Sequence, residues 1–231
     1  MRGQPGTFLH FLSRRLTKIQ VHGQENLTAL DAPGPAMIVI NHTTVVDVVV
    51  TVGTLHKLGY TVDGPCVSGC MHRRHLRPVG TSDMWNFPLA KQIVTGSGII
   101  PTDQHDGRSA YRAARNALKN NECVLMYPEG DVQINSEASP RSWRPGAAAL
   151  AKSFAMPILP IAHHDTRKLG SGSVARSILQ ALSKVFRRPI IHLLIGAPVL
   201  ASEIADLSMQ AANDYLEAKL NQTWLQVKAF S

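Results

Sequence analysis

Short apolar runs, each bounded by turn residues and separated by helical patterns, most constrain the fold of this chain. Such runs, rich in β-branched and other apolar side chains, favour buried strands. The predicted strands are 37–40, 123–127, 157–162 and 189–196. Helical spacing or Ala-rich composition predicts helices at 6–18, 45–59, 106–121, 144–155 and 202–228. Strands that alternate with helices predict an α/β fold with a central, largely parallel mixed sheet flanked by helices.

Composition agrees with a single folded unit. Of the 231 residues, 44% are hydrophobic, which is enough for a core, and Gly and Pro are spread along the chain rather than gathered in a linker. We therefore expect one domain over 19–231, preceded by a short amphipathic helix within 1–18. Its apolar positions at helical spacing are Phe8, Leu12, Leu16 and Ile19, and its cationic residues are Arg14, Arg15 and Lys18.

The formal net charge of +8 suits nucleic acid, an anionic membrane surface or a phosphorylated ligand. Aromatic residues make up only 6% of the chain, and no Lys/Arg stripe alternates with them, which disfavours a platform for single-stranded nucleic acid. The cations of the 6–18 helix suit binding to anionic lipid, although this helix could also simply pack on the domain.

Cysteine content and hydropathy bear on the compartment. The three cysteines, at positions 66, 70 and 123, are too few for a disulfide framework in a chain of this length, which favours a reducing setting. The N-terminal apolar run is too short for a signal peptide, and no uninterrupted apolar run could span a bilayer as a helix. We expect a cytoplasmic protein, at most peripheral on the cytoplasmic membrane.

Two polar stretches stand directly after predicted strands, NHTTVVD at 41–47 and YPEGD at 127–131. Open α/β sheets gather their ligands at the carboxyl ends of the strands, so both stretches are expected at one edge of the sheet. Five residues turn through roughly 500° on an ideal helix. His42 and Asp47 can therefore meet only if His42 precedes the helix and Asp47 lies in its first turns.

A contact between His42 and Asp47 would have a chemical consequence. The carboxylate would set the tautomer of the imidazole and support its protonated form, which leaves the other nitrogen to act as a base. Such a pair can deprotonate a hydroxyl for attack on a carbonyl, and no Ser or Cys is obviously placed as a nucleophile. The structural alternative is that His42 caps the helix and Asp47 interacts with the helix dipole. The loose H-x4-D spacing leaves both open.

Together with the segments around them, these stretches resemble the ordered blocks of the glycerolipid acyltransferase family, whose best-known members are the 1-acylglycerol-3-phosphate acyltransferases. The matched residues are Asn41, His42, Thr44 and Asp47 in the first block, Tyr127, Pro128, Glu129 and Gly130 in the third, Trp143, Arg144 and Gly146 in the following segment, and Leu159, Pro160 and Ile161 in the fourth. The likeness runs from about residue 19 to residue 200, and the order of the blocks makes it specific.

The resemblance implies an enzyme that moves a fatty acyl group from an acyl-CoA or acyl-carrier-protein thioester to a hydroxyl. His42 would be the general base and Asp47 would orient it, while Glu129 and Gly130 would help to shape the acceptor site. The expected acceptor is 1-acylglycerol-3-phosphate or a related lysolipid of phospholipid biosynthesis. The donor is a substrate, and no cofactor is implied.

Two departures from the family pattern concern the acceptor. Gln104 stands where the second block has an arginine. Asp131 and Val132 stand where the third block has T-R. The family arginines are associated with the acceptor's phosphate, which a guanidinium fork suits. Either Arg108, Arg141 or Arg144 reads a phosphate instead, or the acceptor is a non-phosphorylated lipid or a secondary-metabolite alcohol or amine. A non-catalytic lipid-binding protein is the rival from another class.

Two other polar groups have simpler interpretations. Cys66, Cys70, His72 and His75 could suggest zinc, but their spacing is not that of a zinc finger, so no metal is expected. The basic residues there are His72, Arg73, Arg74, His75 and Arg77. They could meet the phosphates of coenzyme A or an acidic carrier protein, or form a solvated face. The histidines of HHD at 163–165 would point to opposite faces of a strand, so we expect at most a loop near the site.

Overall fold

The computed structural model describes residues 5–44, 46–62, 74–81, 98–103, 106–130, 132, 139–140, 142–164, 166–171 and 174–230. The helices are α1 (Pro5–Leu16), α2 (Asp47–Lys57), α4 (Gly107–Lys119), α5 (Gly146–Phe154), α6 (Val174–Ser183), α7 (Ala201–Ile204) and α8 (Met209–Lys228), with the 3₁₀ segments η1 (Gln24–Leu30) and η3 (Thr166–Lys168). The strands are β1 (Lys18–His22), β2 (Ala36–Ile40), β3 (Tyr60–Thr61), β4 (Arg74–Thr81), β5 (Ile100–Thr102), β6 (Cys123–Met126), β7 (Ile158–His164) and β8 (Ile190–Ile195).

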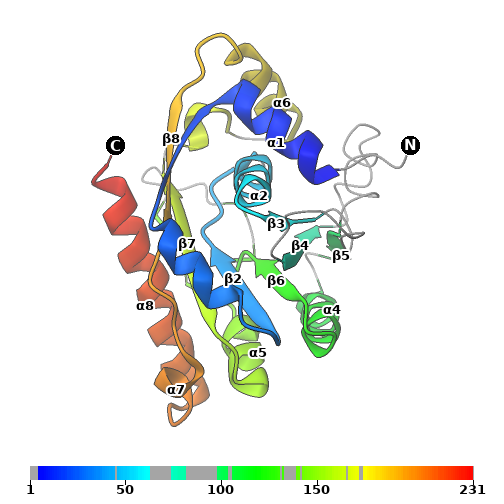
Figure 1. The fold of residues 1–231 in the computed structure, drawn as a ribbon, viewed down its shortest axis with the longest axis vertical. Coiled ribbons are helices and arrows are strands. Elements are labelled where there is room, and N and C mark those ends of the chain that lie inside the picture. Colours follow the sequence, from blue (N-terminus) through cyan, green and yellow to red (C-terminus); the bar gives the residue numbers. More distant parts are fainter. Residues whose placement is uncertain are drawn as a thin grey trace.

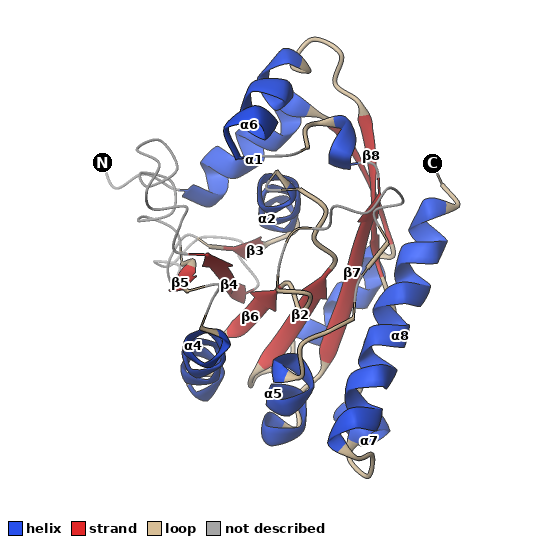
Figure 2. Cartoon of the chain, turned by 180° about the vertical axis from the view of Figure 1, so that it is seen from behind, coloured by secondary structure: helices blue, strands red, loops and turns tan. Residues whose placement is uncertain are grey.

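In the described part of the chain, eight strands form one sheet with helices on both faces (Figures 1 and 2). The strand order is β1-β8-β7-β2-β6-β4-β3, and β5 pairs with β4. These strands pair in parallel, apart from the antiparallel pair of β7 and β8. The predicted α/β fold with a largely parallel mixed sheet is therefore confirmed, and the four predicted strands are β2, β6, β7 and β8.

Two apolar clusters fill the space on either side of the sheet. One lies between the sheet and helices α4, α5 and α8, and the other between the sheet and α1, α2 and η1. Because side chains alternate along a strand, Met37 and Val39 of β2 enter the first cluster, and Ile38 and Ile40 enter the second. All of β2 is buried, which explains why its sequence is apolar throughout instead of alternating.

Helix α1 packs against α2, but its buried face matches the predicted stripe only in part, at Leu12 and Leu16. Its buried residues are Pro5, Gly6, Leu9, Ser13 and Leu16. Phe8, which belongs to the predicted stripe, is 44% exposed, and Ile19 lies in β1 instead. At Gly53 of α2, a Cβ would come within 2.6 Å of the Leu9 carbonyl oxygen, so the absence of a side chain allows the two helices to approach closely. None of the described helices has the length and hydropathy to cross a bilayer.

The helix predicted over 202–228 is divided in two. Helix α7 ends at Ile204, and α8 begins after Ser208, whose hydroxyl accepts a hydrogen bond from the Ala211 N–H as an N-cap. The sequence pattern also does not predict β1, which lies at the edge of the sheet and has only exposed or half-buried residues. Helix α6 is not predicted either, and it leaves apolar residues such as Leu179 exposed.

Candidate active site

The end of β2 is joined to its neighbour β7 by the side chain of Asn41. Its Nδ2 donates to the carbonyl oxygen of His163 at 3.2 Å, and its Oδ1 accepts from the His163 N–H at 3.0 Å. This buried amide extends the β2–β7 pairing beyond its last register pair, Ile40 and Ile161. The chain consequently leaves the strand at a defined position, and the next residue is His42.

His42 and Asp47 lie side by side across the loop before α2. His42 Nδ1 is 3.1 Å from Oδ2 of Asp47, which is the first residue of that helix. The carboxylate holds the proton on Nδ1, so Nε2 carries the lone pair. The His42 side chain is 16% exposed and that of Asp47 is 0% exposed. The imidazole can thus meet a substrate while its partner stays shielded from water.

Asp47 is surrounded by hydrogen-bond donors. Its Oδ2 accepts from the backbone N–H of Thr43 at 2.6 Å and of Thr44 at 2.9 Å. Burial alone would raise the pKa of this carboxyl, but the imidazoles of His163 and His42 and the backbone donor outweigh it, so the pKa is lowered. The N-terminus of α2 also favours an anion there. Asp47 therefore makes both the contact with the helix dipole and the contact with the imidazole.

The loop after β6 forms a second wall of the site. The Tyr127 ring stacks on the His42 ring with 4.3 Å between centroids. Burial and then the charge of Asp47 raise the pKa of Tyr127, so its phenol stays protonated. Glu129 Oε1 accepts from the His42 backbone N–H at 3.1 Å, and Glu129 is only 7% exposed. Glu129 thus contacts the backbone of the candidate base directly.

Gly130 turns the chain after Glu129 with a φ of 77°, a left-handed value that favours glycine. Its N–H donates to the Tyr127 carbonyl oxygen at 3.1 Å, which closes the turn. Arg144 lies across this turn, because a Cβ on Gly130 would come within 2.6 Å of its Nε. The Arg144 N–H donates to the Pro128 carbonyl oxygen at 3.0 Å. An exposed arginine is thus held against the third-block turn.

The remaining candidates from the sequence lie on β7, α5 and α4 or outside the described residues. Pro160 lies within β7, opposite Val39 of β2, and Gly146 begins α5. Arg108 is exposed in the first turn of α4, whose N-cap is Asp106. The candidates outside the described residues are Gln104, Asp131 and Arg141.

His163 is the site residue that the sequence analysis missed. The expectation of a loop at 163–165 was wrong for its first two residues, because β7 continues to His164. The His163 side chain is 0% exposed, and its Nε2 lies 3.4 Å from Asp47 Oδ2. His164 is half-buried. Strand alternation from Ile161, two residues earlier and buried on the α2 side, is the signal that could have located His163.

The described members of the basic group near residue 75 have partners inside the protein. Arg74 donates to backbone carbonyl oxygens near the ends of η1 and α4. His75 Nδ1 and Arg77 Nη1 each lie 3.7 Å from a carboxylate oxygen of Glu122. His72 and Arg73 of this group lie outside the described residues, as do Cys66 and Cys70 of the zinc candidate. Within the described residues, no three His, Cys, Asp or Glu side chains gather as a metal site.

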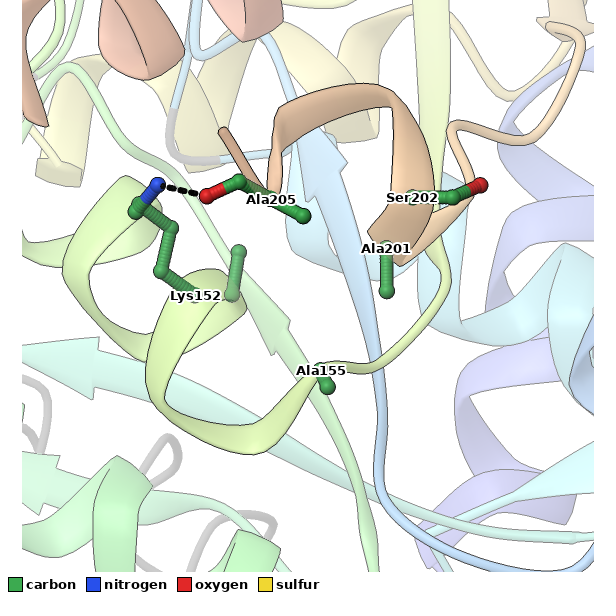
Figure 3. Close-up of a pocket in the computed structure, with 6 residues that line it drawn as sticks. Lys152, Ala155, Ala201, Ser202 and Ala205 are labelled. Carbon is green, nitrogen blue, oxygen red and sulfur yellow. Dashed lines mark hydrogen bonds between the residues drawn. The ribbon is translucent and has the colours of Figure 1, made fainter. Parts of the chain in front are cut away.

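A separate cavity of about 360 Å³ lies between α5 and α7, near the start of β7 (Figure 3). Its lining residues are Ala151, Lys152, Ala155, Ala201, Ser202 and Ala205. Lys152 Nζ donates to the carbonyl oxygens of Ile204, Ala205 and Leu207 at 2.8, 2.8 and 2.6 Å. These bonds use all three ammonium protons, so the one charged lining residue closes α7 and has no donor left for a ligand.

Comparisons with known proteins bear on this arrangement. The family model named Acyltransferase matches residues 18–164, which include His42, Asp47 and His163. A similar solved structure is that of the 1-acyl-sn-glycerophosphate (LPA) acyltransferase PlsC from Thermotoga maritima, with a TM-score of 0.68 and 17% identity over 97% of this chain and 80% of that chain. At this identity the likeness concerns the fold. No curated protein matches the sequence significantly. Because the family model covers more than half of the sequence, the chain belongs to the Acyltransferase family.

Proposed function

We propose that this acyltransferase moves a fatty acyl group from a CoA or acyl-carrier-protein thioester to the hydroxyl of a lysolipid, with His42 as the general base. The 3.1 Å contact between His42 Nδ1 and Asp47 Oδ2 carries the proposal, because it leaves Nε2 of a partly exposed ring as the base. Asn41 and Glu129 support it, because the Asn41 side chain fixes the preceding residue to β7 and Glu129 accepts from the His42 N–H.

The proposed reaction needs no covalent enzyme intermediate. Nε2 of His42 takes the proton from the acceptor hydroxyl as its oxygen bonds to the thioester carbonyl carbon, while Asp47 stabilises the imidazolium. Collapse of the tetrahedral intermediate then breaks the C–S bond, and the imidazolium returns its proton to the thiolate. The products are an ester and a free thiol. Cys123 of β6 is no alternative nucleophile, because burial raises the pKa of its thiol to about 12.

The acceptor is proposed to be 1-acylglycerol-3-phosphate or a related lysolipid that carries phosphate. Its reader would be Arg144, whose guanidinium lies against Gly130, one residue beyond the glutamate that holds the His42 N–H. A guanidinium fork suits bidentate binding of phosphate. Arg108 lies on α4, and within the described part of the chain no contact ties its side chain to this turn. We therefore prefer Arg144 to Arg108 as the substitute for the missing family arginines.

One sequence observation favours a second acceptor class. Where the family pattern has an arginine and a threonine, this sequence has Gln104 and Asp131. A carboxylate two positions after Glu129 in the sequence would repel an anionic headgroup. An uncharged or amine-bearing alcohol of similar chain length is the corresponding acceptor. The two classes differ in whether the preferred substrate carries a phosphate, which a direct comparison of acceptors decides.

An anionic membrane surface is the proposed source of the acceptor. Helices α1 and α6 lie beside each other in both views of the fold, and Leu16 and Ala181 share one apolar cluster (Figures 1 and 2). Their outward apolar side chains, with that of the loop after α6, are Phe8, Phe11, Leu179, Leu182 and Phe186. The segments 5–18 and 174–188 contain Lys and Arg but no acidic residue. Exposed apolar and cationic side chains together suit an interfacial position on anionic lipid.

One assay tests the proposed reaction. The protein is incubated with a labelled acyl thioester and a panel of alcohols with and without phosphate, and both the free thiol and the acylated product are measured. We expect thiol release that depends on the acceptor, with the phosphate-bearing lysolipid as the best substrate. Thiol release without an acylated product, or none with any acceptor, would contradict acyl transfer. Preference for an uncharged or amine-bearing acceptor would contradict only the phosphate assignment.

A further inference from the structure

We propose that His163 is a positioning residue of the reaction, which donates a hydrogen bond to Asp47 and so limits how strongly Asp47 stabilises the protonated form of His42. The inference rests on the proposed function, in which His42 is the base. Asp47 would then be shared between two imidazoles, one that meets the substrate and one that does not.

The placement of His163 brings its Nε2 near Asp47. Both backbone groups bond to Asn41, and the side chain is fully buried. Nε2 lies 3.4 Å from Asp47 Oδ2 without forming a hydrogen bond in this structure, and it has no hydrogen-bond partner among the described residues. This distance is long for a hydrogen bond, as is often seen at catalytic groups without substrate. Because the ring does not reach the surface, His163 can act on the reaction only through Asp47.

Two threonine hydroxyls select the tautomer of His163. Thr166 Oγ1 lies 3.2 Å from His163 Nδ1, and Thr43 Oγ1 lies 2.6 Å from Thr166 Oγ1. If Thr43 donates to Thr166 and Thr166 donates to Nδ1, the ring proton sits on Nε2 and points toward Asp47. In the reverse order the Thr43 hydroxyl would donate to Asp47, whose Oδ1 and Oδ2 lie 3.3 and 3.4 Å from Thr43 Oγ1, but the Nε2 lone pair would face a carboxylate oxygen. The negative charge of Asp47 therefore favours the first order.

The electrostatic surroundings keep this donor uncharged. Burial lowers the pKa of His163, and the charge of Asp47 opposes this only in part, so the ring is neutral at neutral pH. The other ionisable groups that face the two residues are His42, Tyr127, Glu129, His164 and Arg167. A neutral donor draws on the carboxylate lone pairs without cancelling the charge, so Asp47 still orients His42.

The shared carboxylate has a kinetic consequence. Each donor on Asp47 lowers the basicity of its oxygens, and the imidazolium of His42 is then held less tightly. His42 therefore returns its proton to the leaving thiolate more readily. Removal of the His163 donor should therefore stabilise the imidazolium, which moves the acidic limb of the kcat/KM profile to higher pH and lowers kcat.

Two substitutions at His163 and one control separate this role from packing. His163→Gln retains a side-chain N–H donor, His163→Leu removes it, and His164→Leu changes the neighbour on the other face. For His163→Leu we expect the acidic limb to move up by about half a pH unit or more, because a hydrogen bond to a charged group shifts a titration by about that much. KM for both substrates should change less than about twofold, since the ring cannot touch them. The other two variants should retain the wild-type limb.

A folded His163→Leu protein with the wild-type acidic limb would overturn the inference, as would an equal limb shift in His164→Leu. If His163→Leu does not fold, ¹⁵N NMR of the wild-type histidines decides, because a neutral His163 with its proton on Nδ1 would contradict the proposed donor. His42→Ala is assayed in parallel. If it transfers acyl groups at near the wild-type rate, the proposed function itself is wrong. If it is inactive but the His163 variants keep the wild-type limb, only the role of His163 is wrong.

Discussion

Two buried or partly buried charged side chains, Asp47 and Lys152, bind the backbone at helix ends on opposite edges of the sheet. Only Asp47 belongs to the candidate active site. Asp47 sits at the N-terminus of α2 and accepts backbone N–H bonds from Thr43 and Thr44. Lys152 belongs to α5, and its side chain lies at the C-terminal end of α7, where it donates to three carbonyl oxygens. Each charge has the sign that its helix end favours.

The difference lies in what the partners have left over. Every ammonium proton of Lys152 is used on a backbone carbonyl, so that end of the molecule is closed. Asp47 instead holds His42, whose ring is partly exposed and whose second nitrogen is turned to no described residue. A charged side chain at a helix end can therefore support catalysis when one of its partners has a second polar atom that a substrate can reach.

At the Asp47 site, removal of the general base His42 should have the largest effect on kcat. We expect His42→Ala to lower kcat about 10²–10⁴-fold while the fold is retained, because general-base catalysis has this magnitude. Asp47→Asn should be comparably severe, because the wrong tautomer of His42 is then favoured. Rates come from thiol release and folding from circular dichroism. A folded His42→Ala protein with near wild-type kcat would remove the distinction drawn between the two ends.

The opposite substitution, Lys152→Met, should affect stability but not catalysis. It keeps much of the apolar stem and leaves three carbonyl oxygens without their donor, so we expect a loss of about 1–3 kcal/mol in the free energy of unfolding. Urea titration measures this loss, and kcat per folded molecule should equal that of the wild type. If Lys152→Met instead lowers kcat with stability unchanged, the α5–α7 cavity has a part in the reaction.

Arg144 provides a further test of the difference between the two helix ends, because it adds a cation near the Asp47 site. Arg144→Ala should lower kcat/KM for a phosphate-bearing lysolipid roughly tenfold or more and leave that for an uncharged alcohol within about twofold, because a charge-assisted pair is worth about 1.5–3 kcal/mol. Arg108→Ala, on the exposed first turn of α4, is the matched control and should change neither. Equal losses for both acceptors would assign Arg144 a structural role in the Gly130 turn.

Acid should first reduce the contribution of Asp47 and His163 to the stability of the fold. The pKa of His163 lies below its ordinary 6.5 and that of Asp47 below its ordinary 3.8. For both groups the unfolded state binds protons more readily, so their contribution to stability is present above the ordinary value and is lost as the pH falls through the lowered one. The urea midpoint should therefore fall between about pH 7 and about pH 5, and it should fall less in His163→Gln. Equal acid sensitivity of the two proteins would indicate that His163 is charged.

The smallest expected effect concerns the lipid surface. Phe11→Ser and Phe186→Ser should each weaken binding to anionic vesicles a few-fold, since one buried aromatic side chain contributes about 1.5–3 kcal/mol and is only partly inserted. Added salt should weaken it further. Leu200→Ser is the control, because Leu200 is as exposed as Phe11 but lies before α7. If the control weakens binding as much, the proposed α1–α6 surface is wrong.

The sequence by itself determined the central part of the fold. Strands such as 37–40 and 123–127 are short apolar runs between turn residues, and burial on both faces leaves them little choice of structure. The position of Asp47 at the start of a helix was also readable, because local spacing rules out a contact with His42 inside one helix. The block order then predicted the family, which the family model confirms.

Only the tertiary structure decided which side chains complete the site. Asn41 and His163 are 122 positions apart, and they meet because β2 and β7 are neighbours in the sheet. Local periodicity carries no information about strand order, so it could not bring His163 to Asp47 or lay Arg144 across Gly130. The same holds for α1, whose buried face shifted from Phe8 to Leu9 because Gly53 of α2 offers a surface without a side chain. Contacts of this kind depend on shape and on long-range pairing, which no single stretch of the chain contains.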